Sequence, residues 1–274
     1  MAKLTLVLFC ALLFPSAAAA HLRTGTVAVD YKGRIVRMPG APVSAGVYES
    51  DLALHVSVAA GHSLIVYGYL GEPLLRIGRT GVAIVPSSPT AAATRLTLHG
   101  RSAVWHDVRT SSARWTVPVR VDGRRDAIEG RTQRLPRPSL VLWLAVAAAV
   151  GLGVAATRSV TAAGLVSATA AIVAAAGFAL SAYASPGTWI AGLDELAFAL
   201  AGVGALRFGP TAARVPAALW LSLVGLAVGL SKGQVFLHAL VLSTIPGAGT
   251  RLLAAAAIGA GIAGGVIGGA SYLR

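Results

Sequence analysis

His21 is the residue whose position points to the most specific chemistry, because it follows a segment typical of a cleavable signal peptide. Lys3 supplies the positive start, residues 4–14 form an apolar core, and residues 18–20 are small residues that suit a signal peptidase. Cleavage after Ala20 would make His21 the mature N-terminus. Its α-amine and imidazole can then chelate Cu(II) together, as in secreted copper proteins with a histidine brace. The plainer interpretation is that some residue must follow the cleavage site, and here it is histidine.

A copper site of this kind needs a second imidazole, and three histidines are candidates for it. They are His62, His99 and His106. Cysteine ligands are excluded, because Cys10 is the only cysteine and it lies in the apolar core of the signal peptide. The mature chain therefore has no disulfide, no thiolate metal site and no cysteine nucleophile.

Trp105, His106, Asp107 and Arg109 form the densest group of chemically capable side chains. Neighbouring strand residues point to opposite faces, so His106 and Asp107 cannot bind one metal unless the strand is bulged. We expect His106 to be a core or interface histidine bonded to backbone, with metal binding as the alternative. Asp107 and Arg109 share a face with Trp105, which predicts an ion pair against the indole.

Glu72 and Arg76 flank a turn rich in Gly and Pro, and we expect them to pair across it. The chain shows no nucleophile elbow, no closely spaced metal-binding helix motif and no phosphate-binding loop. Nothing in the sequence supports catalysis, and we expect a non-enzymatic protein.

Asp194 and Glu195 are the only acidic residues after the β-rich part of the chain, and they lie within an apolar segment. A carboxylate at the middle of a bilayer costs about 2.5 to 3.5 kcal/mol on insertion scales, so we expect a polar partner. Lys232, His238 and Arg251 are the candidates. One interpretation is a structural ion pair, and the other is a cation or proton site formed by Asp194, Glu195 and His238.

Short alternating runs predict an all-β, immunoglobulin-like sandwich over residues 21–133. In residues 51–58, Leu52, Leu54, Val56 and Val58 alternate with more polar positions and should face the core. About seven strands are expected and no helix of any length. They include a covered central strand at 64–69, strands at 81–85 and 94–98, and an edge strand at 114–122 containing Pro118. Asp122-Gly123 predicts a hairpin.

Residues 134–138 are predicted to form a linker, and residues 139–274 are predicted to form a bundle of about five transmembrane helices. We expect helices at about 139–157, 161–184, 188–206, 216–230 and 251–272. Residues 233–245 either continue the fourth helix or form a separate helix on the outer face, which we favour. Gly261, Gly265 and Gly269 stand at the four-residue spacing that lets membrane helices pack closely, with Gly264 and Gly268 beside them, and packing within the bundle is favoured over dimerisation.

The sequence places this protein in a bacterial cytoplasmic membrane. The signal peptide puts the sandwich outside, and five crossings leave the C-terminus in the cytoplasm, in agreement with the Arg residues of the short loops. The chain has a net charge of +13, and 16 of its 23 Lys and Arg lie in residues 21–138. Since this excess is exported, it suggests anionic lipid headgroups or acidic envelope polymers as partners rather than nucleic acid. The equally weighted alternative is a basic proteome that uses Arg for solubility.

Four motifs between residues 66 and 138 resemble a family of bacterial exported membrane proteins. The motifs are the turn Gly68-Tyr69-Leu70-Gly71-Glu72-Pro73, the strand Trp105-His106-Asp107-Val108-Arg109, Trp115-x-x-Pro118, and the hairpin Asp122-Gly123. The family has no established activity, so the resemblance implies an architecture, a β domain before a helical membrane bundle. Family members often have a second His where Val108 stands and a further His-Trp after it, so a metal site there would keep only His106.

Two functions follow from these observations. The first is a membrane protein of the bacterial envelope whose exported domain binds or scaffolds an envelope partner without catalysing a reaction. The second is the handling of copper or another metal through His21.

Overall fold

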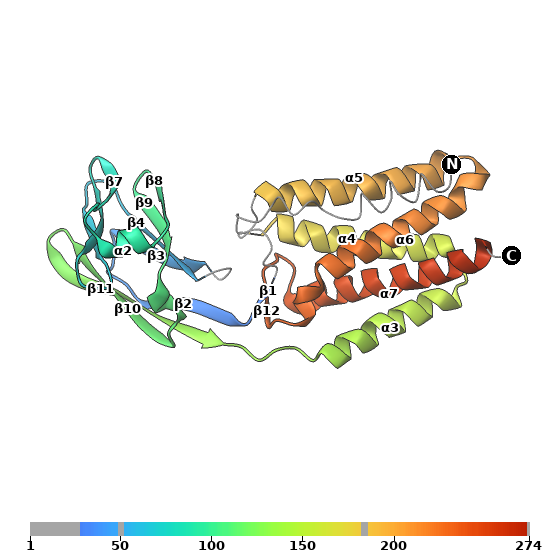
Figure 1. Ribbon diagram of the computed structural model, residues 1–274, viewed down its shortest axis with the longest axis horizontal. Helices are drawn as coiled ribbons and strands as arrows, with labels where there is room; N and C mark the ends of the chain where they lie inside the picture. The colour runs from blue at the N-terminus through green and yellow to red at the C-terminus, as the bar shows by residue number, and fades with distance from the viewer. Residues whose placement is uncertain (1–27, 49–51, 182–185, 273–274) are drawn as a thin grey trace. The chain divides into compact units, whose positions relative to one another are not determined.

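The computed structural model describes residues 28–48, 52–181 and 186–272, including all side chains except those of 186–191 and 271–272 (Figure 1). The expected signal peptide and His21 lie outside the described residues. The chain divides into two compact units. One is Val29–Pro136 and consists mainly of β-strands, and the other contains Arg137–Arg274 and is helical.

The β unit consists of two antiparallel sheets. The larger has the strand order β2-β11-β10-β5-β6-β7, and the smaller has the order β3-β4-β9-β8. The elements in chain order are β1 (Ala28–Val29), β2 (Tyr31–Arg37), β3 (Val43–Tyr48), β4 (Ala53–Val58), β5 (Leu64–Tyr67), β6 (Pro73–Gly78), β7 (Gly81–Ile84), α2 (Pro89–Ala93), β8 (Leu96–His99), β9 (Ser102–His106), the 3-10 helix η2 (Val108–Ser111), β10 (Arg114–Val121) and β11 (Arg124–Arg134).

The two sheets face each other across one hydrophobic core. Alternate residues of β4, β9 and β10 point inward, and Leu54, Trp105 and Val117 are fully buried there. The expected inward set Leu54, Val56 and Val58 is confirmed, whereas Leu52 lies in a turn at a φ of 56°. Each buried side chain of this size contributes roughly 1.5 to 3 kcal/mol. The core therefore fixes which face of each strand is turned outward.

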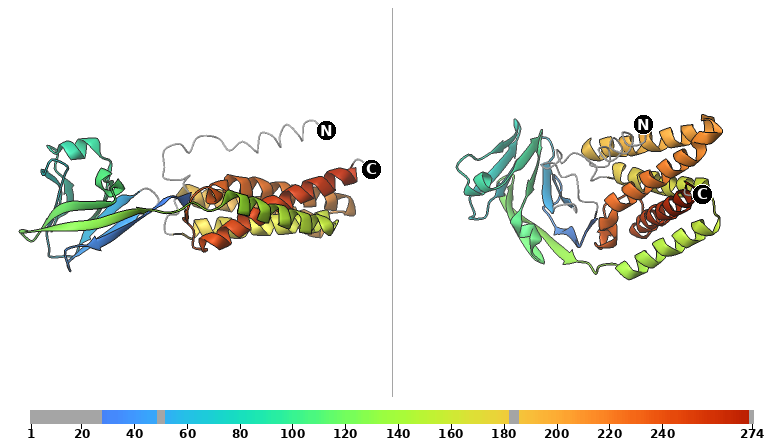
Figure 2. Two further views of the ribbon diagram at one scale, coloured as in Figure 1. Left: turned by 90° about the horizontal axis from the view of Figure 1, so that it is seen from below. Right: turned by 45° about the vertical axis from the view of Figure 1, so that its right-hand side comes forward.

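The expected edge position of β10 is wrong, because β10 lies between β11 and β5. The pairing between β10 and β5 covers only Val119–Val121 of β10. Pro118 lies just outside these pairs, so the N–H that proline lacks interrupts no hydrogen bond with β5. The expected hairpin is present, with Asp122 and Gly123 at φ values of 47° and 83°. After it, the chain forms the eleven-residue strand β11 (Figure 2).

We name the two ends of the β unit by their chain segments. The exit end is where β11 finishes and β2 begins, with Arg134 opposite Tyr31. The hairpin end is where Asp122 and Gly123 join β10 to β11. Because the strands are antiparallel, η2 and the turn between β5 and β6 belong to the exit end, and His62, His99 and Arg101 belong to the hairpin end.

The helical unit contains α3 (Leu140–Ala156), α4 (Val160–Ala179), α5 (Pro186–Phe208), α6 (Arg214–Ser231) and α7 (Gly247–Tyr272). Two short 3-10 helices, η3 (Thr211–Ala213) and η4 (Gly233–Phe236), and the strand β12 (Leu240–Val241) complete it. Among the described residues, three segments are long and apolar enough to cross a membrane, namely Val160–Ala179, Thr211–Ser231 and Gly247–Ala270. The helix Leu140–Ala156 is apolar but shorter. Ser139 and Ser159 cap the first two helices through their hydroxyl groups.

The helices α4, α6 and α7 pack against one another, α3 packs on α7, and α5 lies against α4 and α6 (Figure 1). The glycines of α7 that permit this are Gly261, Gly264 and Gly268, where a Cβ atom would collide with side chains of α6. Gly265 and Gly269 face open space within the described part of the chain. The expected stripe at a spacing of four is therefore wrong, because positions i, i+3 and i+7 share one helix face.

Both predictions for residues 233–245 are wrong. The helix α6 ends at Ser231, and only the short η4 follows before an irregular segment. The Arg251 guanidinium donates hydrogen bonds to the carbonyl oxygens of Val235, His238 and Ala239 at 2.7 to 2.8 Å. In a regular helix, such carbonyl oxygens would accept hydrogen bonds from backbone N–H groups of the same helix. Here the Arg251 guanidinium supplies the donors instead.

Candidate functional site in the β unit

The two motif stretches of the β unit meet at the exit end. After β9, the Asp107 carboxylate accepts a hydrogen bond from the Trp105 indole N–H at 3.0 Å. The same carboxylate binds the Arg109 guanidinium at 2.6 and 2.8 Å, and its side chain is fully buried. Asp107 also caps η2 by accepting from the Arg109 amide. The expected ion pair against an indole is therefore present, and it orders the chain between β9 and β10.

Arg109 connects this group to the turn between β5 and β6, which belongs to the other sheet. Its guanidinium lies 5.0 Å from the centre of the Tyr69 ring and donates to the Tyr67 carbonyl at 3.3 Å. The Tyr69 hydroxyl in turn accepts from the Val108 amide at 3.2 Å. A cation over an aromatic face contributes about 0.5 to 2 kcal/mol, depending on its exposure. The two sheets are thus joined at the exit end by polar contacts.

Glu72 is held inside the same turn. Its carboxylate accepts from the Ser88 hydroxyl at 2.8 Å, the Thr90 amide at 3.2 Å and the Leu70 amide at 3.0 Å. These bonds, above all one with the Thr90 side chain, lower the pKa of Glu72 to about 2. Gly68 is required beside them, since a Cβ there would collide with the Glu72 carboxylate and the Thr90 hydroxyl.

The expected pair between Glu72 and Arg76 is wrong. The Glu72 oxygens are occupied by donors from its own turn and from the start of α2. Arg76 is exposed on β6 and forms no ion pair within the described part of the chain. We define Trp105, Asp107, Arg109, Tyr69 and Glu72 as the motif cluster. Since its carboxylates accept hydrogen bonds from the protein at both oxygens, the cluster stabilises the exit end rather than presenting a free base.

The structure separates the candidate metal ligands. His106 is exposed at the exit end, so its expected core position is wrong, because Ala103 and Trp105 occupy the core face of β9. His99 pairs with Ser102, four residues before His106, which is a separation of about 13 Å along the strand. His62 belongs to the hairpin end, where its ring nitrogen is 2.7 Å from Asp122. No group of three His, Cys, Asp or Glu residues able to hold a metal occurs among residues 28–48, 52–181 and 186–272.

Hydrogen bonds also hold Asp122 at the hairpin end. The backbone amide of Ser63 donates to its carboxylate at 2.8 Å, and this bond, followed by the one with His62, lowers the pKa of Asp122. Arg101 lies nearby and donates to four carbonyl oxygens, those of Val58, Gly78, Ala59 and His62. His62 therefore contributes to the structure of this end through both its ring and its backbone.

Sequence reasoning missed Ser88, Thr90 and Arg101. Ser88 followed by Pro89 is a helix-start signature, and Ser88 does cap α2 by accepting from the Ala91 amide. That signal could have located α2, but not its contact with Glu72, which is 16 residues earlier. Burial lowers the pKa of His55, another residue not singled out, whose ring packs 6.1 Å from that of Tyr48.

In the helical unit, the structure joins Glu195 of α5 to Lys232 after α6. The Lys232 ammonium is 3.4 Å from one Glu195 carboxylate oxygen and 5.8 Å from the centre of the Phe178 ring. Asp194 is exposed and forms no ion pair with any described residue. His238 lies after η4, and its carbonyl accepts from Arg251. Of the expected polar cluster, Glu195 and Lys232 are therefore in contact, and Arg251 is used to order residues 235–239.

The outer face of the larger sheet carries a basic surface that sequence reasoning did not locate. Arg114, Arg131 and Arg34 stand directly opposite one another on β10, β11 and β2. A hollow of about 540 Å³ adjoins them. It is lined by Lys32, Arg34, Ala113, Arg131, Thr132, Gln133 and Arg134. Strand register brings these cations together, although they are up to 100 positions apart in the sequence.

No protein-family model, curated protein or solved structure matches this chain.

Proposed function

We propose that this protein is an integral membrane protein of the bacterial cytoplasmic membrane whose β unit is an extracytoplasmic, non-enzymatic binding or scaffolding domain. The observation that carries the proposal is the use of the motif cluster. Its acidic and basic side chains are occupied in joining the two sheets, while the exposed outer face of the larger sheet is basic. Such a domain presents a rigid binding surface to a partner and no reactive side chain of this cluster.

The proposal includes five membrane crossings and an immunoglobulin-like arrangement of the β unit. The three apolar segments support membrane insertion. For α3, seventeen residues span about 26 Å, close to the thickness of a bilayer core. For α5, the pairing of Glu195 with Lys232 lowers the cost of a carboxylate in an apolar segment. Two antiparallel sheets around one core support the sandwich.

Cysteine labelling in intact cells tests the location of the two units. After signal cleavage the chain would contain no cysteine, so each introduced cysteine reports on its own position. We expect Arg79→Cys in the β unit to react with a membrane-impermeant maleimide in intact cells. Arg158→Cys, between α3 and α4, should react only after permeabilisation. Labelling of Arg158 but not Arg79 in intact cells would reverse the proposed orientation.

Photo-crosslinking in cells tests the binding role. A photoreactive amino acid at exposed positions of the β unit, such as Thr97 or His106, should give a discrete adduct with an envelope partner. The same group at buried Val117 serves as the control and should give none. If no exposed position gives an adduct under conditions where the protein is correctly inserted, the binding role is wrong.

A further inference from the structure

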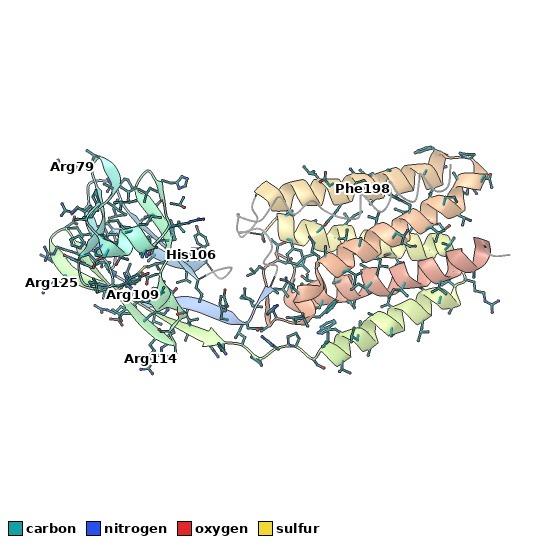
Figure 3. All side chains as sticks on the ribbon, in the orientation of Figure 1. Arg79, His106, Arg109, Arg114, Arg125 and Phe198 are labelled. Atoms are coloured by element: carbon teal, nitrogen blue, oxygen red, sulfur yellow. The ribbon has the colours of Figure 1, made fainter. Side chains whose placement is uncertain are left out.

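Arg114, Arg131 and Arg34 form a row of like charges across three neighbouring strands. Arg114 pairs with Arg131, and Arg131 pairs with Arg34, so all three point to the same outer face. Directly opposite side chains have Cβ atoms about 4.5 to 5.5 Å apart, and like charges at that distance destabilise a sheet. All three are exposed, and none forms an ion pair with a described residue. Arg114 extends away from the ribbon in Figure 3.

Elsewhere on the larger sheet, an arginine is paired with acidic side chains. Farther along β2, Arg37 is bound by Asp126 at 3.0 Å and Glu129 at 2.6 Å. The bond with Glu129 contributes most to raising the pKa of Arg37. Among the described residues, no acidic side chain lines the hollow beside the arginine row. Within that part of the chain the row therefore lacks the counter-ion that Arg37 has, and an external anion would supply it.

Guanidinium groups favour phosphate among such anions. Each presents a planar set of N–H donors that can bind two phosphate oxygens at once. The hollow of about 540 Å³ is large enough for a phosphodiester headgroup, and Gln133 provides a neutral polar group on its wall.

The covalent chain brings this site close to a membrane. Arg134 is six residues before Leu140, the first residue of α3. Six residues reach at most about 20 Å, which limits the distance between Arg134 itself and Leu140. If α3 enters the bilayer there, the hollow is within reach of lipid headgroups, whose layer is several ångströms thick on each side of the core.

The exit end also exposes apolar side chains. Leu70 is 78% exposed and Val108 is 67% exposed, and both are held in place by the motif cluster through Tyr69. Val108 begins η2, whose Thr110 carbonyl accepts from the Thr132 hydroxyl on the wall of the hollow. Basic and apolar side chains together are typical of surfaces that rest on the membrane interface. They favour a lipid over a soluble phosphate.

We propose that Arg34, Arg114 and Arg131 bind the phosphate of anionic phospholipid headgroups and so dock the exit end of the β unit on the membrane. This inference rests on the proposed function, because it requires the β unit to stand outside the membrane into which the helices insert. The motif cluster then has a role in docking, since it holds Leu70 and Val108 at the surface that meets the lipid.

The test uses the processed full-length protein in nanodiscs of phosphatidylcholine with increasing phosphatidylglycerol. A fluorophore on Ser111→Cys, in η2 at the exit end, is quenched by lipids that carry a nitroxide on the headgroup. We compare two charge-matched variants. One changes Arg34, Arg114 and Arg131 to Gln, and the other changes Arg79, Arg124 and Arg125, which belong to the hairpin end, to Gln. Arg114 of the first variant and Arg79 and Arg125 of the second are labelled in Figure 3.

Quenching should rise with phosphatidylglycerol in the wild-type protein and fall at high salt. Each arginine near an anionic surface contributes about a fivefold preference, so the first variant should need on the order of 100 times more anionic lipid. The second variant should behave like the wild type. The single change Arg131→Gln, at the centre of the row, gives an independent measurement if the triple variant does not fold, and it should weaken docking about fivefold.

Three outcomes would overturn the inference. Quenching could be independent of phosphatidylglycerol, or both triple variants could lose it equally, which would indicate total charge rather than a site. Inorganic phosphate at millimolar concentration could abolish the response, which would assign the row to a free anion. These results leave the cysteine-labelling test of orientation untouched, so a failure of docking is distinguishable from a failure of the proposed function.

Discussion

Replacing Asp107 by Ala should strongly destabilise the β unit. The side chain is fully buried and accepts hydrogen bonds from Trp105 and Arg109. Its loss leaves the indole N–H without an acceptor in the core, which costs about 1 to 3 kcal/mol. It also removes the cap of η2, worth about 1 kcal/mol, and leaves a largely buried guanidinium without its carboxylate. Since removing one partner of a buried pair costs about 3 to 5 kcal/mol, we expect a total of about 4 kcal/mol.

Hydrogen exchange of the processed protein in nanodiscs measures this loss. The slowest amides of β4 and β9 exchange only when the unit unfolds, so about 4 kcal/mol corresponds to about a thousandfold faster exchange. Asp107→Asn keeps one acceptor oxygen and should lose about half as much. Thr97→Ala, at an exposed position on β8, should stay within about 0.5 kcal/mol of the wild type. If Asp107→Ala matches Thr97→Ala, the polar junction between the sheets does not stabilise the domain.

Four further predictions concern other parts of the chain. Because the pKa of Glu72 is lowered to about 2 from its ordinary 4.5, its stabilising effect should be complete above pH 4.5 and lost as the pH falls toward 2; Glu72→Gln should remove this part of the acid unfolding curve. Gly264→Ala should destabilise the bundle by about 1 to 3 kcal/mol, whereas Gly265→Ala should be neutral or stabilising, as measured by thermal unfolding in detergent. Lys232→Met should reduce the yield of inserted protein, and Lys232→Arg should restore it. Copper titration should show tighter binding for a chain starting at His21 than for one extended by Met, and equal affinities would exclude the histidine brace.

Strand periodicity made several inward and outward positions predictable. The alternation around Leu54 follows from a period of two, and the Asp122-Gly123 turn follows from its residue types. The pair of Asp107 and Arg109 was expected from their spacing, although Arg109 lies in η2 and not on a strand. These features depend on residues near one another in the sequence, so local rules suffice for them.

Contacts between distant segments were not predictable in the same way. Glu72 takes its donors from Ser88 and Thr90 rather than from Arg76, because the fold returns the chain to the turn after 16 residues. The arginine row exists only in the register of β10, β11 and β2, so no short motif reveals it. On α7, spacing alone could not choose between Gly264 and Gly265, since the choice depends on which face meets α6.

The position of β11 determines how the β unit would respond to mechanical load. The strand is eleven residues long, lies between β2 and β10, and leads directly to the segment before α3. A pull along its axis from the helical anchor would act on two hydrogen-bonded ladders at once, in shear, rather than opening one ladder bond by bond. A tether on an outer strand would peel away at low force. Attachment through an interior strand should let the β unit withstand tension from the helical unit without unfolding.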